Sequence, residues 1–392
     1  MSIVTQKEVS LKEWLAVAAV AVGTFAMVTV EQLPVGLLTA IGGSLDISEG
    51  AAGLMVTVPG LVASATAPLL PVAIGRLDRR TVLIGLLSLM VVANAISVVA
   101  PNFGVMLASR FLVGIGIGGF WALAAGIAVR LVPERHVPRA TSLAFGGATA
   151  ANVLGVPAGT LIGGLTDWRV AFAAVGVLAL LVVGALLWLL PRIPATAPVR
   201  LRELPRQFRN PVVRVAVIST FLVVGGQFAA FTFISPILQN VSGVPADMIG
   251  PVLLGFGVAG VVGTFVGSSW NVKRRVVTLS VTLAVIMAIF PLVGTTPVTG
   301  SILLLIWGLA YGGAPVAVQT WILQGAGASA EPATALNTTV FNLAIAFGAA
   351  FGGIVADNTA ITGALWFGAL LMALTALAAV TVSARRGVPA KG

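Results

Sequence analysis

Apolar residues follow one another in long runs that short polar connections separate. Because a helix needs about 20 such residues to cross a bilayer, we marked runs of that length and found twelve. They lie near residues 12–41, 50–73, 81–100, 104–129, 139–164, 168–190, 212–238, 246–269, 275–294, 298–323, 333–356 and 360–383. Membrane helices tolerate the Gly and Pro that several runs contain. The pattern therefore predicts an all-α membrane protein with twelve transmembrane helices.

Basic residues are distributed unevenly among the connections. When the connections are numbered alternately with the N-terminus inside, 20 of the 22 Lys and Arg fall inside, Arg169 falls outside and Arg110 falls within a run. Positive charge accumulates on the cytoplasmic side of membrane proteins. The distribution thus predicts that both termini are cytoplasmic, in a multi-pass protein of a bacterial inner membrane.

The composition excludes several other classes. Charged residues make up 9% of the chain, whereas soluble domains have about 25%. The net charge of +10 does not indicate nucleic acid, since the basic clusters follow the topology. The chain has no cysteine and one histidine, His136, in a basic loop. No nucleophile–base pair or metal-ligand cluster is recognisable, so we expect neither an enzyme nor a cofactor or metal.

Two direct repeats divide the chain. Residues 78–83 (DRRTVL) recur as residues 273–278 (KRRVVT), and residues 140–143 (ATSL) recur as residues 333–336 (ATAL), at offsets of 195 and 193. The connection between them is basic and rich in proline, which disfavours a continuous helix. We predict two six-helix halves, 1–190 and 212–392, that a cytoplasmic linker, 191–211, joins. Parallel repeats of this kind are typical of major facilitator transporters.

Two charged residues lie deep inside apolar runs. Glu31 is in the first run and Arg110 in the fourth, and the predicted topology places both toward the outer side. A carboxylate at mid-bilayer costs about 2.5–3.5 kcal/mol on insertion scales, so it is rarely kept without a partner or a task. We interpret Glu31 and Arg110 as the proton-coupling centre of a transporter. The alternative is a buried ion pair with a structural role only.

The connection after the second run resembles the signature loop of the major facilitator superfamily. Residues 75–83 read GRLDRRTVL, and Asp78 stands where a carboxylate can cap the next helix. The resemblance implies a conformational latch on the cytoplasmic side. Its residues would be Gly75, Asp78, Arg79, Arg80 and Arg130. The alternative is a helix cap with ordinary positive-inside charge.

Glycine-rich segments resemble two further motifs of that superfamily. Residues 110–119 (RFLVGIGIGG) match an arginine followed by a glycine run, and residues 155–159 (GVPAG) resemble the antiporter motif of the drug:proton branch, with Gly-Val-Pro in place of Gly-Pro. Small residues let helices approach closely, and Pro157 is expected to kink its helix. We therefore predict a helix-packing role for Gly114, Gly118, Gly155, Pro157 and Gly159.

Amide and aromatic side chains are the remaining candidates for the substrate site. An uncharged amide in hydrocarbon needs a partner or a cavity, and aromatic faces beside amides suit a flat polar ligand. For any single aromatic residue the alternative is lipid contact. The predicted substrate-binding residues are Gln32, Trp121, Asn152, Gln227, Phe231, Tyr311, Gln319, Asn337 and Asn342.

Nearly the whole chain resembles the bacterial purine-ribonucleoside efflux pumps, with sugar and arabinose efflux permeases as near neighbours. The similar segments are residues 47–50 (ISEG), 78–80 (DRR), 118–122 (GGFWA), 130–133 (RLVP), 226–229 (GQFA) and 306–308 (IWG). The resemblance implies a monomeric exporter of nucleoside-like solutes that is driven by proton entry. Sugar efflux, multidrug efflux and uncoupled facilitated transport remain alternatives, since one fold carries many cargoes.

Overall fold

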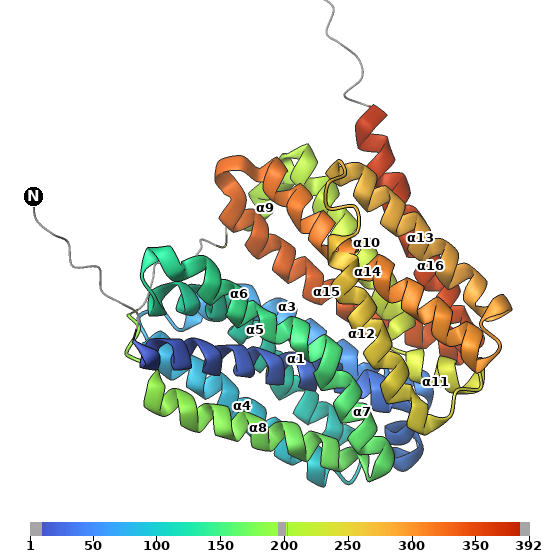
Figure 1. The fold of residues 1–392 in the computed structure, drawn as a ribbon, viewed down its shortest axis with the longest axis horizontal. Coiled ribbons are helices and arrows are strands. Elements are labelled where there is room, and N and C mark those ends of the chain that lie inside the picture. The colour runs from blue at the N-terminus through green and yellow to red at the C-terminus, as the bar shows by residue number, and fades with distance from the viewer. Residues whose placement is uncertain (1–9, 195–200, 202, 385–392) are drawn as a thin grey trace, which may run out of the picture.

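The computed structural model describes residues 10–194, 201 and 203–384, which form helices and no strand (Figure 1). The first part of the chain contains α1 (Leu11–Leu45), α2 (Glu49–Ala52), α3 (Leu54–Ala73), α4 (Arg79–Val99), α5 (Phe103–Leu131), the 3₁₀ turn η1 (Glu134–His136), α6 (Val137–Ala150), the π-helical turn η2 (Ala151–Gly155), α7 (Val156–Leu165) and α8 (Trp168–Leu189). The second part contains α9 (Glu203–Arg206), η3 (Gln207–Arg209), α10 (Pro211–Phe231), α11 (Ile234–Asn240), η4 (Ala246–Met248), α12 (Ile249–Phe265), α13 (Val272–Val293), α14 (Pro297–Ala326), η5 (Gly327–Ser329), α15 (Ala330–Asn358) and α16 (Ile361–Ala384).

Twelve helical segments of the described chain are long and apolar enough to cross a membrane. Each overlaps one of the twelve predicted runs, so the predicted fold class is confirmed. Polar residues at the connections set where the helices begin. The side chains of Asp78, Asn102 and Asp167 accept backbone N–H bonds at the starts of α4, α5 and α8, as N-cap residues do.

The helices form two groups (Figure 1). Helices α1 to α8 pack with one another, and helices α10 to α16 do the same. We call the end at which α1 begins and α16 ends the terminal end. The groups diverge toward the terminal end and meet toward the opposite end, where α3 contacts α15, α7 contacts α12, and α1 contacts α11.

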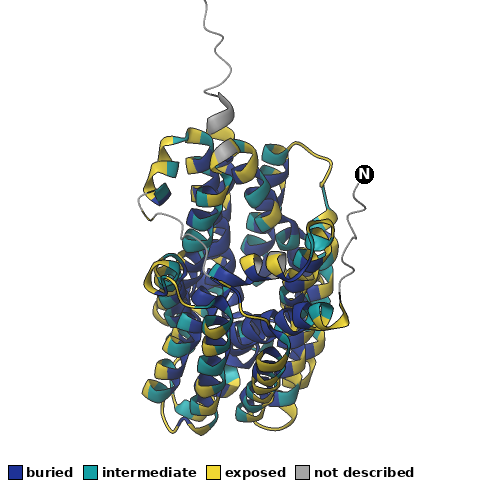
Figure 2. Cartoon of the chain, turned by 90° about the vertical axis from the view of Figure 1, so that its left-hand side faces the viewer, coloured by how far each residue is buried: buried dark blue, intermediate teal, exposed yellow. Residues whose placement is uncertain are grey.

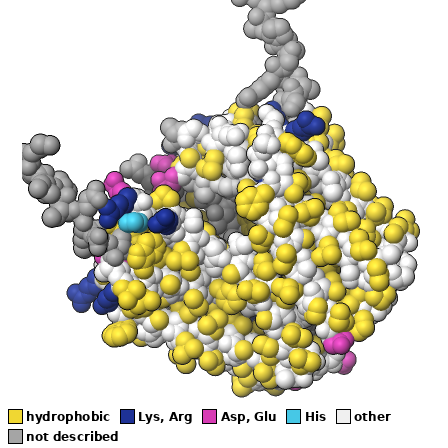
Figure 3. Space-filling model, in the orientation of Figure 1, with side chains coloured by type: hydrophobic (Ala, Val, Ile, Leu, Met, Phe, Trp, Pro, Cys, Tyr) yellow, Lys and Arg dark blue, Asp and Glu magenta, His cyan; other side chains and the backbone are white. Residues whose placement is uncertain are grey.

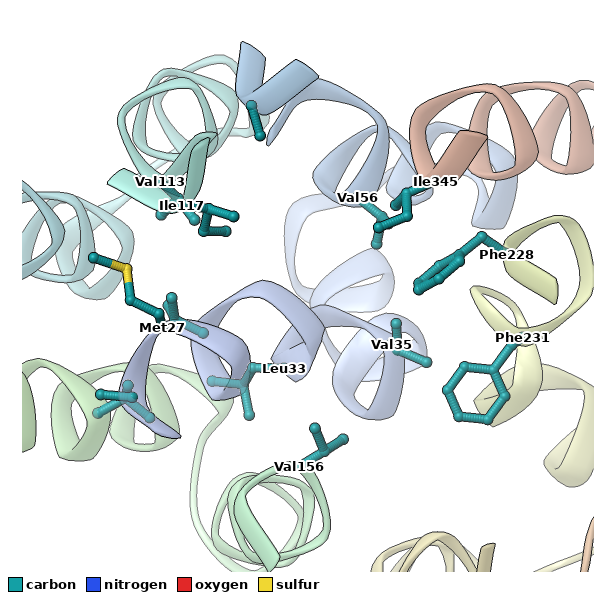
Figure 4. Packing of buried hydrophobic residues seen from close by; sticks show 14 of the residues in the cluster. Met27, Leu33, Val35, Val56, Val113, Ile117, Val156, Phe228, Phe231 and Ile345 are labelled. Carbon is teal, nitrogen blue, oxygen red and sulfur yellow. The ribbon is translucent and has the colours of Figure 1, made fainter. Parts of the chain in front are cut away.

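Apolar side chains fill both groups and the junction between them. In Figure 4, Val35 of α1 and Val56 of α3 lie near Phe228 of α10 and Ile345 of α15. Buried residues occupy the interior in Figure 2, whereas large apolar side chains such as Trp188 remain exposed on the outside. Figure 3 shows hydrophobic side chains over most of one face, with charged ones gathered at its margins. Such a surface suits a hydrocarbon solvent better than water.

The predicted linker is only partly described, since residues 195–200 and 202 lie outside the described residues. Its last part forms α9 and η3, which pack against α15 and against the start of α10. A continuous helix does not span the described part, because α9 ends after four residues. The division of the chain at 190 and 211 stays a prediction.

Candidate functional site

A cavity of about 680 Å³ lies between the two groups of helices. Residues of α1, α5, α6, η2 and α7 line it on one side, and residues of α10, α12, α14 and α15 line it on the other. All nine residues predicted to bind substrate are in this lining: Gln32, Trp121, Asn152, Gln227, Phe231, Tyr311, Gln319, Asn337 and Asn342. Glu31 also lines the cavity, and among the described residues it is the one Asp, Glu, Lys or Arg that does so. We call this space the central cavity.

Glu31 lies in α1, three residues before Pro34, and its side chain is 8% exposed. Within the described residues, no hydrogen-bond or ion-pair partner contacts its carboxyl group. The neighbouring Gln32 likewise has a buried Oε1 without a partner in the described chain. An acid in this position faces a space that a ligand or water can enter, so its charge can change without breaking a contact within the protein.

Arg110 lies in α5 and is fully buried, but it does not line the central cavity. Its Nη1 donates to the backbone oxygen of Val30 at 3.1 Å and its Nη2 donates to Ser97 Oγ at 2.9 Å. Its guanidinium carbon is 4.9 Å from the centroid of the Phe172 ring. Glu31 and Arg110 are therefore close in depth, yet Arg110 bonds to the backbone of α1 while Glu31 faces the central cavity, and they form no ion pair.

Pro34 explains why Arg110 bonds to a backbone oxygen. In an α-helix the N–H of residue 34 would donate to the oxygen of residue 30, four positions earlier, and proline has no N–H. Val30 is thus the residue whose oxygen Pro34 leaves without its usual donor, and Arg110 supplies a donor instead. The arginine compensates for a break in the hydrogen-bond ladder of α1, one residue away from Glu31.

Three asparagine side chains of the central cavity can offer acceptors to it. The Nδ2 groups of Asn152 and Asn342 donate to backbone oxygens one turn earlier in their own helices, at 3.1 and 2.9 Å. Asn337 Nδ2 donates to Gln319 Oε1 at 2.7 Å, which leaves Asn337 Oδ1 buried without a partner in the described chain. One N–H of each of these asparagines is engaged within the protein, and their side-chain oxygens can accept from hydroxyl or N–H donors of a ligand.

The second group of helices supplies the aromatic part of the cavity wall. The rings of Phe231 and Phe256 stack with centroids 4.5 Å apart. Trp307, fully buried behind them, donates from Nε1 to Gln227 Oε1 at 2.7 Å and so orients that amide. Sequence reasoning missed Phe145, which stacks on Trp121, and Phe256. Phe256 stands between two glycines, which expose an aromatic face, and that spacing was the available signal.

Glycines of the predicted packing motifs lie where helices touch. A methyl group added at Gly155 would lie 2.1 Å from Thr29 Oγ1, and one at Gly159 would lie 2.3 Å from Leu33, both in α1. At Gly114 and Gly118 it would meet backbone atoms of α3 at 2.8 and 2.6 Å. The GVPAG segment therefore packs against the helix that carries Glu31.

Between α6 and α7 the helix widens into the π-turn η2, which holds Asn152, and Pro157 follows in the first turn of α7. π-Turns inside helices are frequent at functional sites because they turn a side chain away from its regular direction. Here the turn brings an amide to the cavity wall.

The residues of the predicted latch bond to the last turn of α8 and to the chain that follows it. Asp78 accepts from the backbone N–H of Arg80 at 2.9 Å and from that of Ile193 at 3.0 Å. Arg80 donates to the backbone oxygen of Leu187, and Arg130 to that of Pro194. Gly75 has a φ of +47°, which favours glycine. In this conformation the loop is bonded within the first group of helices.

Hydrogen bonds between the two groups lie at the end opposite the termini. Asp357 of α15 accepts from Ser48 Oγ at 2.7 Å and from the backbone N–H of Gly50 at 2.9 Å, so it caps α2 from the other group. Asn240 donates to Glu49 at 3.2 Å. We call these residues the outer clasp. In the described part of the chain, no group of three His, Cys, Asp or Glu is placed to hold a metal ion.

Proteins of a known family are similar to this chain over most of its length. The family model described as Major Facilitator Superfamily matches residues 20–334. Purine ribonucleoside efflux pumps named NepI from Shigella sonnei and Escherichia coli K12 are 36% identical over 368 residues, which is 93% of this chain and 93% of each relative. The pump of that name from Salmonella enteritidis is 36% identical over 374 residues, or 94% of each chain.

Solved structures of distant proteins share the fold. An inward-facing, unoccupied bacterial homologue of the human lysosomal transporter Spinster has a TM-score of 0.72 at 15% identity and covers 96% of both chains. A partially occluded, inward-open structure of the Escherichia coli xylose transporter XylE has a TM-score of 0.72 at 16% identity. It covers 98% of this chain and 99% of its own.

Proposed function

The chain belongs to the major facilitator superfamily, and we propose that it exports a purine-ribonucleoside-like solute by alternating access, driven by proton entry. It is a multi-pass transporter of a bacterial inner membrane. The described chain has twelve helices that are long and apolar enough to cross a membrane, and its bacterial relatives are named as efflux pumps. The proposal includes a monomer made of two six-helix halves, with its termini in the cytoplasm.

The central cavity carries the proposal, because it combines one acid with a set of amides and stacked aromatic rings. Its volume of about 680 Å³ is in the range of about 300–1,000 Å³ that small-molecule sites have. A purine offers a flat face to aromatic side chains, and a ribose offers hydroxyl donors to amide oxygens. With Glu31 as the charged group of the wall, the cavity is unfavourable for anions such as nucleotides.

Glu31 is the proposed proton carrier. Its carboxyl faces the central cavity without a cationic partner in the described chain, so it can gain a proton when the cavity opens outward and lose it when the cavity opens inward. Substrate and proton would then compete for the same space. Arg110 acts in this scheme as a positioning residue that holds the turn of α1 before Glu31.

In alternating access the two ends of the molecule open and close in turn. If the positive-inside rule places the terminal end in the cytoplasm, the outer clasp closes the far side and the groups diverge toward the cytoplasm. This arrangement corresponds to an inward-facing conformation. The loop with Asp78 would exchange its present partners after α8 for contacts with the second half when the cytoplasmic side closes.

The test uses purified protein reconstituted into vesicles, with transport measured into an acidified interior. Protein oriented inside-out should accumulate radiolabelled inosine or guanosine against its gradient. Glu31→Gln should abolish uphill accumulation while exchange of labelled for unlabelled nucleoside continues. Glu134→Gln is the matched control, because this acid is exposed at the terminal end.

Three outcomes would contradict parts of the proposal. Uphill transport by Glu31→Gln would show that another group carries the proton. Equilibration without accumulation by the unmodified protein would indicate an uncoupled facilitator. Accumulation of pentoses or cationic drugs in place of nucleosides would keep the mechanism and reject the substrate class.

A further inference from the structure

A second cavity, of about 960 Å³, opens at the terminal end of the second group of helices. The chain from Glu203 to Val212, the first turn of α13, the last turns of α14 and the start of α15 form its wall. None of its lining residues lines the central cavity. We call it the basic cavity, and the transport scheme proposed above gives it no role.

Cations outnumber acids in the wall of the basic cavity. Arg206, Arg209 and Lys273 line it together with one acid, Glu203. In the described part of the chain, no carboxylate lies within ion-pair distance of these three cations. The Nζ of Lys273 is 6.0 Å from the ring centroid of Trp321. Because Trp321 is buried, the ammonium group of Lys273 lies over a packed aromatic side chain.

The direction of the helices adds to the positive potential. Both α10 and α13 begin at the basic cavity, and the N-terminus of a helix carries partial positive charge. Lys273, Arg274 and Arg275 nevertheless occupy the first turn of α13. Like charges at this end of the dipole are unfavourable unless an anion compensates them.

The repeat in the first half shows how such a turn is compensated by the protein itself. In the first repeat the position that corresponds to Lys273 is Asp78, whose carboxylate caps α4. Arg80 of that turn donates to the backbone oxygen of Leu187. In the second half that position is a cation, the cap of α13 is the neutral Asn271, which accepts from the backbone N–H of Lys273 at 3.1 Å, and an open cavity lies beside it.

We propose that the basic cavity binds a phosphate-bearing anion. Arg side chains match the oxygens of a phosphate in pairs, and a Lys adds a compact charge. The phosphate can belong to the headgroup of an anionic phospholipid, since basic pockets between membrane helices bind such headgroups, or to a soluble phosphate ester. Occupation would tie α9, α10, α13 and α14 together at the end where the two groups diverge.

Native mass spectrometry of the full-length protein in detergent tests the proposal. The protein is titrated with short-chain phosphatidylglycerol, with phosphatidylcholine of equal chain length, and with glycerol 3-phosphate. The cavity variant is Arg206→Gln/Arg209→Gln, whose side chains are exposed, so that folding should be preserved. The control variant, Lys12→Gln/Arg139→Gln, removes two exposed charges at the terminal end of the first group.

We expect the unmodified protein to bind phosphatidylglycerol more tightly than phosphatidylcholine. The cavity variant should bind it about tenfold more weakly, and the control variant about equally well. Binding of glycerol 3-phosphate with the same dependence on the two arginines would identify a soluble phosphate ester as the ligand, and its absence would identify the lipid. Lys273→Gln should weaken binding as well.

Two results would overturn the proposal. One is an equal loss of binding in the cavity and control variants, which would indicate a general attraction to basic surface. The other is equal binding of the two lipids by the unmodified protein. Nucleoside transport is not part of this readout, so failure here leaves the proposed transport function untouched, and the reverse also holds.

Discussion

The contribution to stability of the hydrogen bond from Arg110 to the Val30 oxygen should depend on Pro34, which leaves that oxygen without its backbone donor. We expect Arg110→Met to destabilise the protein and Pro34→Ala to rescue part of that loss. Alanine restores the backbone N–H that can donate to Val30, so the oxygen no longer needs the arginine. In the unmodified background, Pro34→Ala should change stability little, because Arg110 already occupies that oxygen.

The expected magnitude follows from the contacts. Arg110→Met removes donors at 3.1 and 2.9 Å and leaves the Val30 oxygen buried without its donor. An unsatisfied buried acceptor costs about 1–3 kcal/mol, although interhelical hydrogen bonds in membranes average only about 0.6 kcal/mol. We therefore expect a loss of about 1–3 kcal/mol. The new backbone bond in the double variant should return about 1 kcal/mol of it.

A double-mutant cycle in the free energy of unfolding, measured by titration with sodium dodecyl sulfate, provides the assay. Ser97→Ala is the matched control, since it removes the acceptor of Arg110 Nη2 and leaves the bond from Nη1 to Val30 intact. Its combination with Pro34→Ala should be additive. Additivity within about 0.5 kcal/mol for the Arg110 and Pro34 pair as well would refute the reasoning. Recovery of proton-driven transport in the double variant would further separate positioning of Glu31 from proton chemistry at Arg110.

Two further predictions concern the cavity wall and the outer clasp. Trp307→Phe removes the donor that orients Gln227, a loss of about 1 kcal/mol in binding free energy. The KM for transport should therefore rise about fivefold with kcat unchanged. An unchanged KM would mean that the amide of Gln227 does not contact substrate. Asp357→Ala removes two bonds across the clasp, about 2 kcal/mol together, and should shift the population about 30-fold toward outward opening. Since the chain has no cysteine, a single Thr39→Cys substitution beside Gln239 can report this opening. A thiol reagent added outside should label the cysteine faster when Asp357→Ala is present. Equal labelling with and without Asp357→Ala would contradict the predicted shift.

Much of the candidate site was predictable because polar groups are rare in apolar helices. An amide or a carboxylate inside such a run needs a partner or a cavity, and that requirement selected Glu31 and the six amides that line the central cavity, while the expected fit of aromatic faces to a flat ligand selected Trp121, Phe231 and Tyr311. The same reasoning also selected Arg110, whose part in proton coupling stays a prediction, but it did not give the partner of this side chain. An arginine in hydrocarbon can be satisfied by backbone oxygens as well as by a carboxylate, and the partner depends on which side of α1 it meets.

The sequence by itself determined quantities that run along the membrane normal. Run lengths set twelve helices, capping residues set where several of them begin, and the distribution of Lys and Arg predicts which end faces the cytoplasm. Tertiary structure alone decided the rotation of each helix about its axis. Apolar side chains cover most sides of these helices, so rotation is set by packing, such as the close approach of Gly155 to Thr29. For that reason only the folded chain separates Glu31 in the central cavity from Arg110 behind α1, and only it assembles the basic cavity from three stretches that are far apart in the sequence.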